Sequence, residues 1–335
     1  MGHAGRMIGR RALLGGLVGT LLGVPRRAVA QPAPRTHRVG VLRPAAADAR
    51  FRHDFDGFRD ALRESGFLEG TNLAIEYRMR PGPPEEILGM AAELVERPVD
   101  VIVAISPVAV VAASRATRTI PIVAVDLETD PLASGLVTSL ARPGGNVTGL
   151  FLDFPELAGK WLELMREAVP TLSRVAVLWD PATGPAQMKA AEMAARTLRL
   201  QIQVLPARTA ADLDAAVQAA VKERAGALVV LSSPVFNAAR RQVATLTGRS
   251  RLPSIMAFPG YAEDGGLIGY GPHLRSMFAQ AGRHVVRVLK GAAPREIPVE
   301  RPTQFALLIN QTTAQALGVT IPPSLLARAD EVIQR

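Results

Sequence analysis

The 335-residue sequence contains no cysteine and few aromatic side chains. The absence of cysteine excludes disulfide bonds, thiolate metal sites and a cysteine nucleophile. Hydrophobic residues make up 48% of the chain and aromatic residues only 4%, so small and branched aliphatic side chains must fill the core. A chain of this length has room for two domains, each with a core of its own.

The sequence also lacks the common motifs of nucleotide, metal and hydrolase chemistry. It contains no G-x-x-x-x-G-K-[ST] loop, no strand-linked G-x-G-x-x-G turn, no H-E-x-x-H pair and no G-x-S-x-G elbow. The five histidines are scattered, at positions 3, 37, 53, 273 and 284. We therefore expect no metal site, no cofactor and no enzymatic activity.

A basic surface for nucleic acid is not indicated either. The formal net charge is +9, with 39 basic and 30 acidic side chains, but residues 1–30 hold five of the arginines and no acid. Without those five, 34 basic side chains stand against 30 acidic ones, a net charge of +4. No run rich in lysine or arginine remains, so we expect no nucleic-acid partner.

Residues 1–30 have the parts of an export signal. A positively charged stretch ends at Arg10-Arg11 and precedes an apolar run of 13 residues, 12–24, which is too short for a membrane span of about 20 residues. Ala28-Val-Ala30 supplies the small residues of a signal peptidase site. The arginine pair favours the twin-arginine route, and a Sec signal that carries two arginines is the alternative. We predict cleavage near Ala30 and a periplasmic mature protein.

A pattern of strands and helices occurs twice after this segment. The first copy opens with the apolar strand Arg38-Val-Gly-Val-Leu42 and the second with Arg174-Val-Ala-Val-Leu178. Each copy continues with a helix, a strand and a second helix. Two further apolar strands follow in each copy, at 99–105 and 120–125 in the first and at 225–231 and 252–257 in the second. The duplication predicts an α/β fold of two similar Rossmann-like lobes with mostly parallel sheets.

Ligands of such sheets bind outside the carboxyl ends of the strands, so we expect a cleft between the lobes. Turn-rich segments predict about three crossings between the lobes, at 142–149, 265–272 and near 302–310, and several crossings permit hinge closure. We assign 37–147 with about 270–301 to the N-terminal lobe. We assign 148–269 with about 302–335 to the C-terminal lobe.

Three segments carry a resemblance to a known family. They are Phe58-Arg-Asp-Ala-Leu-Arg-Glu-Ser-Gly-Phe-Leu-Glu-Gly-Thr-Asn-Leu-Ala-Ile-Glu-Tyr-Arg78, Asp130-Pro-Leu-Ala-Ser-Gly-Leu-Val-Thr-Ser-Leu-Ala-Arg-Pro-Gly-Gly-Asn-Val-Thr-Gly149 and Leu317-Gly-Val-Thr-Ile-Pro-Pro-Ser-Leu-Leu-Ala-Arg-Ala-Asp330. They closely resemble the ABC transporter substrate-binding protein family that includes tryptophan- and tyrosine-binding members. The resemblance covers about residues 37–333. It implies a type I periplasmic-binding-protein fold and a monomer that delivers a small ligand to an ABC permease in the inner membrane. It does not identify the ligand.

The loops at the strand ends supply the candidate ligand-binding residues. Ser106 followed by Pro107 predicts the start of a helix, whose first amides suit a carboxylate; a plain helix cap is the alternative. Arg43 suits a carboxylate, and Asp126 or Asp130 suits an ammonium group. The full set is Arg43, Pro44, Ser106, Pro107, Asp126, Asp130, Asp180, Thr183, Ser232, Ser233, Phe258, Tyr261 and Tyr270.

The favoured function is therefore an extracytoplasmic solute-binding protein of an ABC importer, with an amino acid or aromatic acid as the ligand. Leu127-Glu128-Thr129 departs from the shorter side chains usual in the family, so the family's ligand preference does not transfer directly. Two alternatives stay open: a ligand-sensing module for a membrane signalling partner, and a two-lobe enzyme with an interdomain site.

Overall fold

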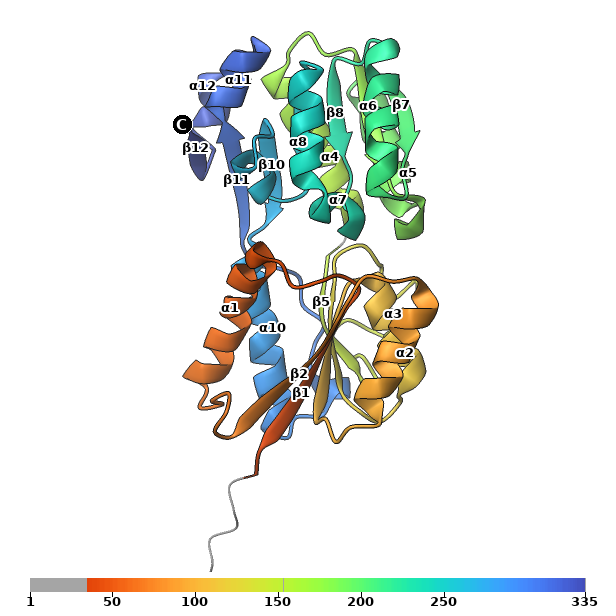
Figure 1. Cartoon of the computed structure of the whole chain (residues 1–335). Coiled ribbons are helices and arrows are strands. Elements are labelled where there is room, and N and C mark those ends of the chain that lie inside the picture. The colour runs from red at the N-terminus through yellow and green to blue at the C-terminus, as the bar shows by residue number, and fades with distance from the viewer. Residues whose placement is uncertain (1–34, 153, 335) are drawn as a thin grey trace, which may run out of the picture. The chain divides into compact units, whose positions relative to one another are not determined.

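The computed structural model of the protein describes residues 35–152 and 154–334. The predicted signal peptide, residues 1–30, lies outside the described residues. From Thr36 onward the chain forms one unit, in which the strands make two separate sheets (Figure 1). Among the described helices, none is both long and apolar enough to cross a bilayer.

The first sheet has five parallel strands in the order β2-β1-β3-β4-β5. They are β1 (His37–Arg43), β2 (Leu73–Met79), β3 (Val101–Ile105), β4 (Ile122–Asp126) and β5 (Val147–Phe151). One face is covered by α1 (Ala49–Glu64) and α10 (Leu274–Leu289), the other by α2 (Pro84–Val95) and α3 (Pro107–Ala116).

Alternation along β1 shows why this sheet needs helices on both faces. Val39 and Val41 pack into the core beneath α1 and α10, whereas Leu42 packs with α2 and α3. Parallel strands that are buried on both faces have nearly continuous apolar sequences. On α1, Phe51, Phe55 and Phe58 lie on one helix face, with stacked ring centroids 5.2 and 4.6 Å apart.

The second sheet has seven strands in the order β12-β11-β10-β9-β8-β6-β7, parallel except between β10 and β11. The strands are β6 (Arg174–Trp179), β7 (Gln201–Pro206), β8 (Ala227–Val230), β9 (Ser254–Met256), β10 (Ile268–Pro272), β11 (Phe305–Asn310) and β12 (Glu331–Ile333). The helices are α4 (Phe154–Ala168), α5 (Ala186–Thr197), α6 (Leu213–Lys222), α7 (Pro234–Ala238), α8 (Arg240–Arg249), α9 (Gly260–Glu263), α11 (Gln311–Leu317) and α12 (Pro323–Leu326). Short 3-10 turns are η1 (Pro181–Thr183), η2 (Ala210–Asp212) and η3 (Pro294–Glu296).

The chain passes between the two sheets three times. It leaves the first sheet after β5, returns between β10 and α10, and enters the second sheet again before β11. The first crossing differs from the sequence interpretation, which placed it at 142–149. Val147 to Phe151 pair with β4, so the Pro/Gly-rich segment is a turn within the first lobe. We use "first lobe" for the first sheet with its helices and "second lobe" for the second.

Candidate functional site

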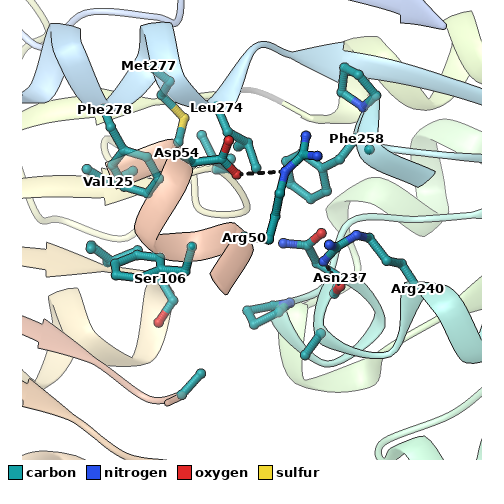
Figure 2. Close-up of a pocket in the computed structure, with 18 of the residues that line it drawn as sticks. Arg50, Asp54, Ser106, Val125, Asn237, Arg240, Phe258, Leu274, Met277 and Phe278 are labelled. Carbon is teal, nitrogen blue, oxygen red and sulfur yellow. Dashed lines mark hydrogen bonds and ion pairs between the residues drawn. The ribbon is translucent and has the colours of Figure 1, made fainter. Parts of the chain in front are cut away.

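A cavity of about 210 Å³ lies between the carboxyl ends of the two sets of strands. The first lobe contributes side chains from the ends of β1, β3 and β4 and from α1 and α10. The second lobe contributes α7, the start of α8 and the loop from β9 into α9 (Figure 2). The volume limits the occupant to a small molecule, and the position is the one expected for parallel sheets.

Ser106 is a strained residue with a free hydroxyl at this cavity. It precedes α3 with φ 98° and ψ 158°, a backbone region that is almost confined to glycine and costs about 1–3 kcal/mol. The residue is 9% exposed, and its Oγ has no hydrogen-bond partner among the described residues. The helix starts where the sequence predicted, but the hydroxyl does not cap it. A strained, buried and unsatisfied hydroxyl at a cavity is typical of a binding site.

Arg43 is the last residue of β1, and its side chain lines the cavity. Its guanidinium lies 4.1 Å from the centroid of the Phe51 ring and donates to the carbonyl oxygens of Ala45 and Ala46. Burial lowers the pKa of Arg43. No described carboxylate lies within 4.0 Å of this guanidinium, which leaves it available to an anionic ligand group.

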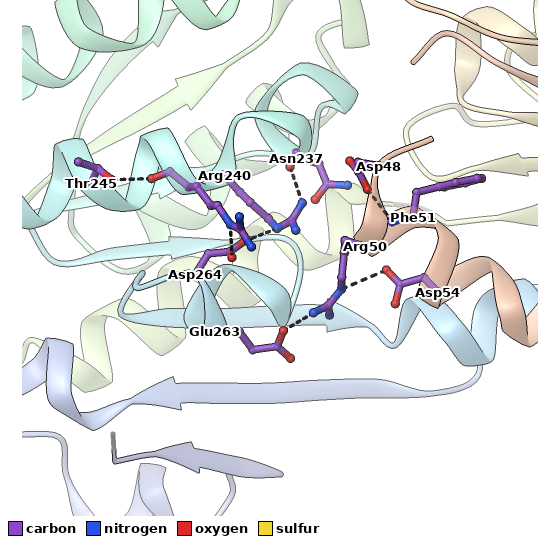
Figure 3. Close-up of polar contacts among 10 residues, drawn as sticks. Asp48, Arg50, Phe51, Asp54, Asn237, Arg240, Thr245, Glu263 and Asp264 are labelled. Carbon is purple, nitrogen blue, oxygen red and sulfur yellow. Dashed lines mark hydrogen bonds and ion pairs between the residues drawn. The ribbon is translucent and has the colours of Figure 1, made fainter. Parts of the chain in front are cut away.

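A chain of charged groups joins the lobes on one side of the cavity (Figure 3). Arg50 on α1 pairs with Asp54 one turn later, with 3.3 Å between Nε and Oδ2, and its Nη1 donates to Glu263 on α9 of the second lobe. Asp54 is buried, and burial raises its pKa against the opposing effect of Arg50. Gly260 lets the guanidinium approach, because a Cβ there would lie 3.1 Å from Arg50 Nη2.

The second lobe carries its own ion pair next to this chain. Arg240 Nε lies 2.6 Å from Asp264 Oδ2, and Arg241 Nε lies 2.7 Å from Asp264 Oδ1. Arg240 also donates to the carbonyl oxygen of Asn237 over 3.1 Å. Arg240 and Asn237 both line the cavity (Figure 2), so the wall formed by the second lobe presents a guanidinium held in place by a carboxylate.

A second contact between the lobes involves carboxyl groups and hydroxyls. Ser232 Oγ, at the end of β8, donates to Glu128 Oε1 of the first lobe over 2.7 Å. Asp126 is fully buried beside Glu128; its Oδ1 accepts from the amides of Glu128 and Thr129, and its Oδ2 has no hydrogen-bond partner among the described residues. The pKa of Glu128 is raised to about 8, first by burial and secondly by the nearby Asp126 carboxylate.

The structure places five of the residues predicted from strand ends along the cavity. They are Arg43, Pro44, Ser106, Ser233 and Phe258. Four others lie directly behind this wall or beside it. Asp126 and Ser232 make the contacts just described. Ser233 Oγ donates to Asp180 over 2.7 Å, and Thr183 Oγ1 donates to the Asp180 carbonyl oxygen.

The remaining predicted residues do not face the cavity, and the reasons are physical. Tyr261 is wholly buried in the core of the second lobe, where its hydroxyl lies 2.6 Å from Ser254 Oγ and 3.2 Å from Thr247 Oγ1. The prediction that Tyr261 binds the ligand is therefore corrected. Tyr270 packs against Phe305, with ring centroids 6.2 Å apart.

Pro107 and Asp130 serve local structure instead of the cavity. Pro107 is the first residue of α3 and does not line the cavity. Asp130 is exposed, and its Oδ1 accepts from the amides of Leu132 and Ala133. Its carboxylate therefore caps a turn.

Several residues that line the cavity were not predicted from the sequence. For one of them, Asp54, the sequence does contain an indication. Asp54 lies three residues after Phe51 and four before Phe58, on the apolar face of α1. A carboxylate at such a position predicts a buried charge that needs a partner. The residues without such a signal include Arg50, Asn237, Arg240, Glu263, Met277 and Phe278.

Comparison with known proteins gives three matches of different kinds. The chain is 27% identical over 268 residues to the tyrosine-binding protein of Clostridioides difficile, which covers 78% of this chain and 76% of that protein. It superposes with a TM-score of 0.81 on a conserved domain protein from Vibrio cholerae, at 28% identity, covering 89% of this chain and all of that one. The TM-score is also 0.81, at 24% identity and the same coverage, to a Streptococcus pneumonia ABC domain in complex with L-Trp.

These likenesses confirm the expected fold, the type I periplasmic-binding-protein fold. The model of a family described as ABC transporter substrate binding protein matches residues 38–333, nearly all of the described chain. The cavity between two open parallel sheets fits that assignment. The chain belongs to the ABC transporter substrate-binding protein family.

Proposed function

We propose that this protein captures an amino acid or an aromatic acid between its lobes and hands it to an ABC permease in the inner membrane. The observation that carries the proposal is the cavity between the strand ends, where a free buried hydroxyl and a guanidinium face apolar side chains. The tyrosine-binding relative and the L-Trp complex support this class of ligand.

The cavity offers separate partners for the two ends of such a ligand. A carboxylate fits Ser106 Oγ, the guanidinium of Arg43 and the first amides of α3, which have no acceptor within the helix. An ammonium group fits the carboxylate of Asp54. An apolar body fits among Phe51, Phe258 and Phe278 and the aliphatic groups beside them.

Delivery requires that the cleft open and close. We propose that residues 37–152 with 274–300 move as one body against residues 154–272 with 305–334, about the three crossings. We further propose a monomer that acts as a carrier and catalyses no reaction. Export by the signal in residues 1–30, cleavage near Ala30 and a periplasmic location complete the proposal; intact-mass measurement of exported protein tests the cleavage.

The test is calorimetry on the chain from residue 31 with four probes. L-tyrosine and L-tryptophan carry both charged ends, tyramine lacks the carboxylate and 3-phenylpropionate lacks the amine. We expect one of the amino acids to bind more tightly than either single-ended probe, and a ligand at 100 times its Kd to add about 2.7 kcal/mol of stability. Failure of all four probes would contradict the proposed ligand class.

A matched pair of serine variants locates the site. Ser106→Ala removes a hydrogen bond to the ligand and should cost about 1.5–3 kcal/mol of affinity for a charged group, or about 0.5–1.5 for a neutral one. Ser114 lies on the same helix, is buried with an unpartnered Oγ and does not line the cavity. Ser114→Ala should bind like the unmodified protein, and equal losses in both variants would contradict the assignment.

A further inference from the structure

Three carboxyl groups meet where the lobes touch at the ends of β4, β6 and β8. Asp126 and Glu128 come from the first lobe, and Asp180 comes from the second. Their donors are hydroxyls and backbone amides: Ser232 Oγ donates to Glu128 and Ser233 Oγ donates to Asp180, each over 2.7 Å, and amides donate to Asp126 and Asp180. No described lysine, arginine or histidine lies within 4.0 Å of any of the three carboxylates.

The serine that bridges the lobes is held rigidly by its own lobe. The amide of Ser232 donates to Gln187 Oε1 over 2.9 Å, and Gln187 Nε2 donates back to the carbonyl oxygen of Ser232 over 3.2 Å. Both residues are fully buried. The hydroxyl therefore reaches Glu128 only when the lobes stand as they do here, and the bond reports on closure.

In this arrangement Glu128 is only partly exposed and has no described cation within 4.0 Å. Asp126 is already fully buried, with one oxygen unsatisfied, and Asp180 approaches from the other lobe. A buried carboxylate without a cation is costly, and such groups take up a proton instead. We propose that closure of the lobes is coupled to the uptake of one proton by the Asp126–Glu128 carboxyl pair.

The sign of the effect follows from linkage. In this arrangement the pKa of Glu128 is raised to about 8, first by burial and secondly by the Asp126 carboxylate. Opening the lobes removes the contribution of burial, so the pKa of Glu128 is lower in the open form, and between the two values the closed form holds one proton more than the open form. Each unit of rising pH therefore lowers the ratio of closed to open molecules up to tenfold. Above about 8 the ratio stays at its lowest level, and below the pKa of the open form it stays at its highest.

Other charged groups on the same cavity must be separated from this effect. The described lining residues with charge are Arg43, Asp48, Arg50, Asp54, Arg240, Glu263, His273 and Glu331. Of these, Asp54 has a raised pKa but an arginine partner. Glu128→Gln leaves all of them in place and keeps an oxygen that accepts from Ser232.

The absence of cysteine allows a direct test without any ligand. Two exposed residues, Glu85 on α2 and Met193 on α5, lie on different lobes. Cysteines introduced there take a fluorophore pair at unique positions, and single-molecule energy transfer then gives the closed fraction between about pH 5 and pH 9.5. The proposal rests on the lobe movement proposed above, but the distances are read whether or not any probe ligand binds.

We expect the closed fraction of the otherwise unmodified protein to fall as pH rises, and that of Glu128→Gln to stay high and flat. Ser232→Ala removes the bridging bond and should lower the closed fraction most at low pH. A closed fraction that does not change with pH overturns the proposal. So does an equal change with pH in Glu128→Gln, which would assign the effect to another group.

Discussion

The two contacts that join the lobes differ in how their charge is balanced. The contact from Arg50 to Glu263 pairs opposite charges, with side chains 35% and 39% exposed. The contact from Ser232 to Glu128 joins a hydroxyl to a carboxyl group that has Asp126 and Asp180 near it. The first is a partly exposed ion pair that salt screens, and the second depends on pH. One cleft therefore responds to two different properties of the solution.

The largest expected effect concerns the Arg50–Glu263 contact, whose two partners should contribute unequally to stability. Arg50→Gln leaves Asp54 buried without its cation and should lower the free energy of unfolding by about 1–3 kcal/mol. Glu263→Gln removes only a partly exposed partner and should cost less than about 1 kcal/mol. Denaturant titration of both variants checks this. Equal losses would mean that Asp54 does not depend on Arg50.

The next effect tests the second contact. Asp126→Asn removes a negative charge but keeps an oxygen for the amides of Glu128 and Thr129. The pKa of Glu128 should fall, so the midpoint of the closed fraction should move to lower pH. Asp130→Asn is the matched control, since Asp130 caps an exposed turn in the same loop. A midpoint unmoved by Asp126→Asn would refute the coupling between the two carboxyl groups.

A change in salt concentration should distinguish the two contacts, and its expected effect is smaller. Raising the ionic strength should weaken the Arg50–Glu263 pair by up to about 1 kcal/mol and leave the Ser232–Glu128 bond nearly unchanged. The closed fraction of the unmodified protein should fall with salt, and that of Glu263→Gln should not. Equal responses of the two proteins would contradict the role of this ion pair in closure.

The smallest effect concerns the approach of Arg50 to α9. Gly260→Ala places a Cβ 3.1 Å from Arg50 Nη2, which is a tight contact with the end of a flexible side chain. We expect the guanidinium to shift slightly and the closed fraction to fall by less than a factor of about two. The same energy-transfer pair measures it, and an effect as large as that of Glu263→Gln would show that Gly260 itself is essential to the contact.

The strands of both sheets could be predicted from the sequence because each is a short apolar run and the pattern occurs twice. The apolar strands at 38–42 and 174–178 appear as β1 and β6, and those at 99–105 and 120–125 appear as β3 and β4. The prediction that the chain crosses between the lobes at 142–149 was wrong. A turn rich in proline and glycine indicates a change of direction but not which sheet the next strand joins. Residues 147–151 are apolar enough for either sheet.

The site was harder to predict because a strand end fixes where a loop starts and not where its side chains point. Ser106 and Phe258 line the cavity, but Tyr261 turns into the core because Ser254 and Thr247 offer partners for its hydroxyl there. The contacts between the lobes join residues more than 100 positions apart, such as Glu128 with Ser232 and Arg50 with Glu263. No local sequence pattern predicts such pairs.

The central claim is that a ligand is held between lobes that close around it. The most direct test is the distance between labels on α2 and α5 at fixed pH, without a ligand and then with a saturating amount of whichever amino acid probe binds in calorimetry. We expect the ligand to shift the distances to one closed population, and Ser106→Ala to need more ligand to reach it. A tightly bound ligand that leaves the distances unchanged would contradict closure of the lobes around the ligand.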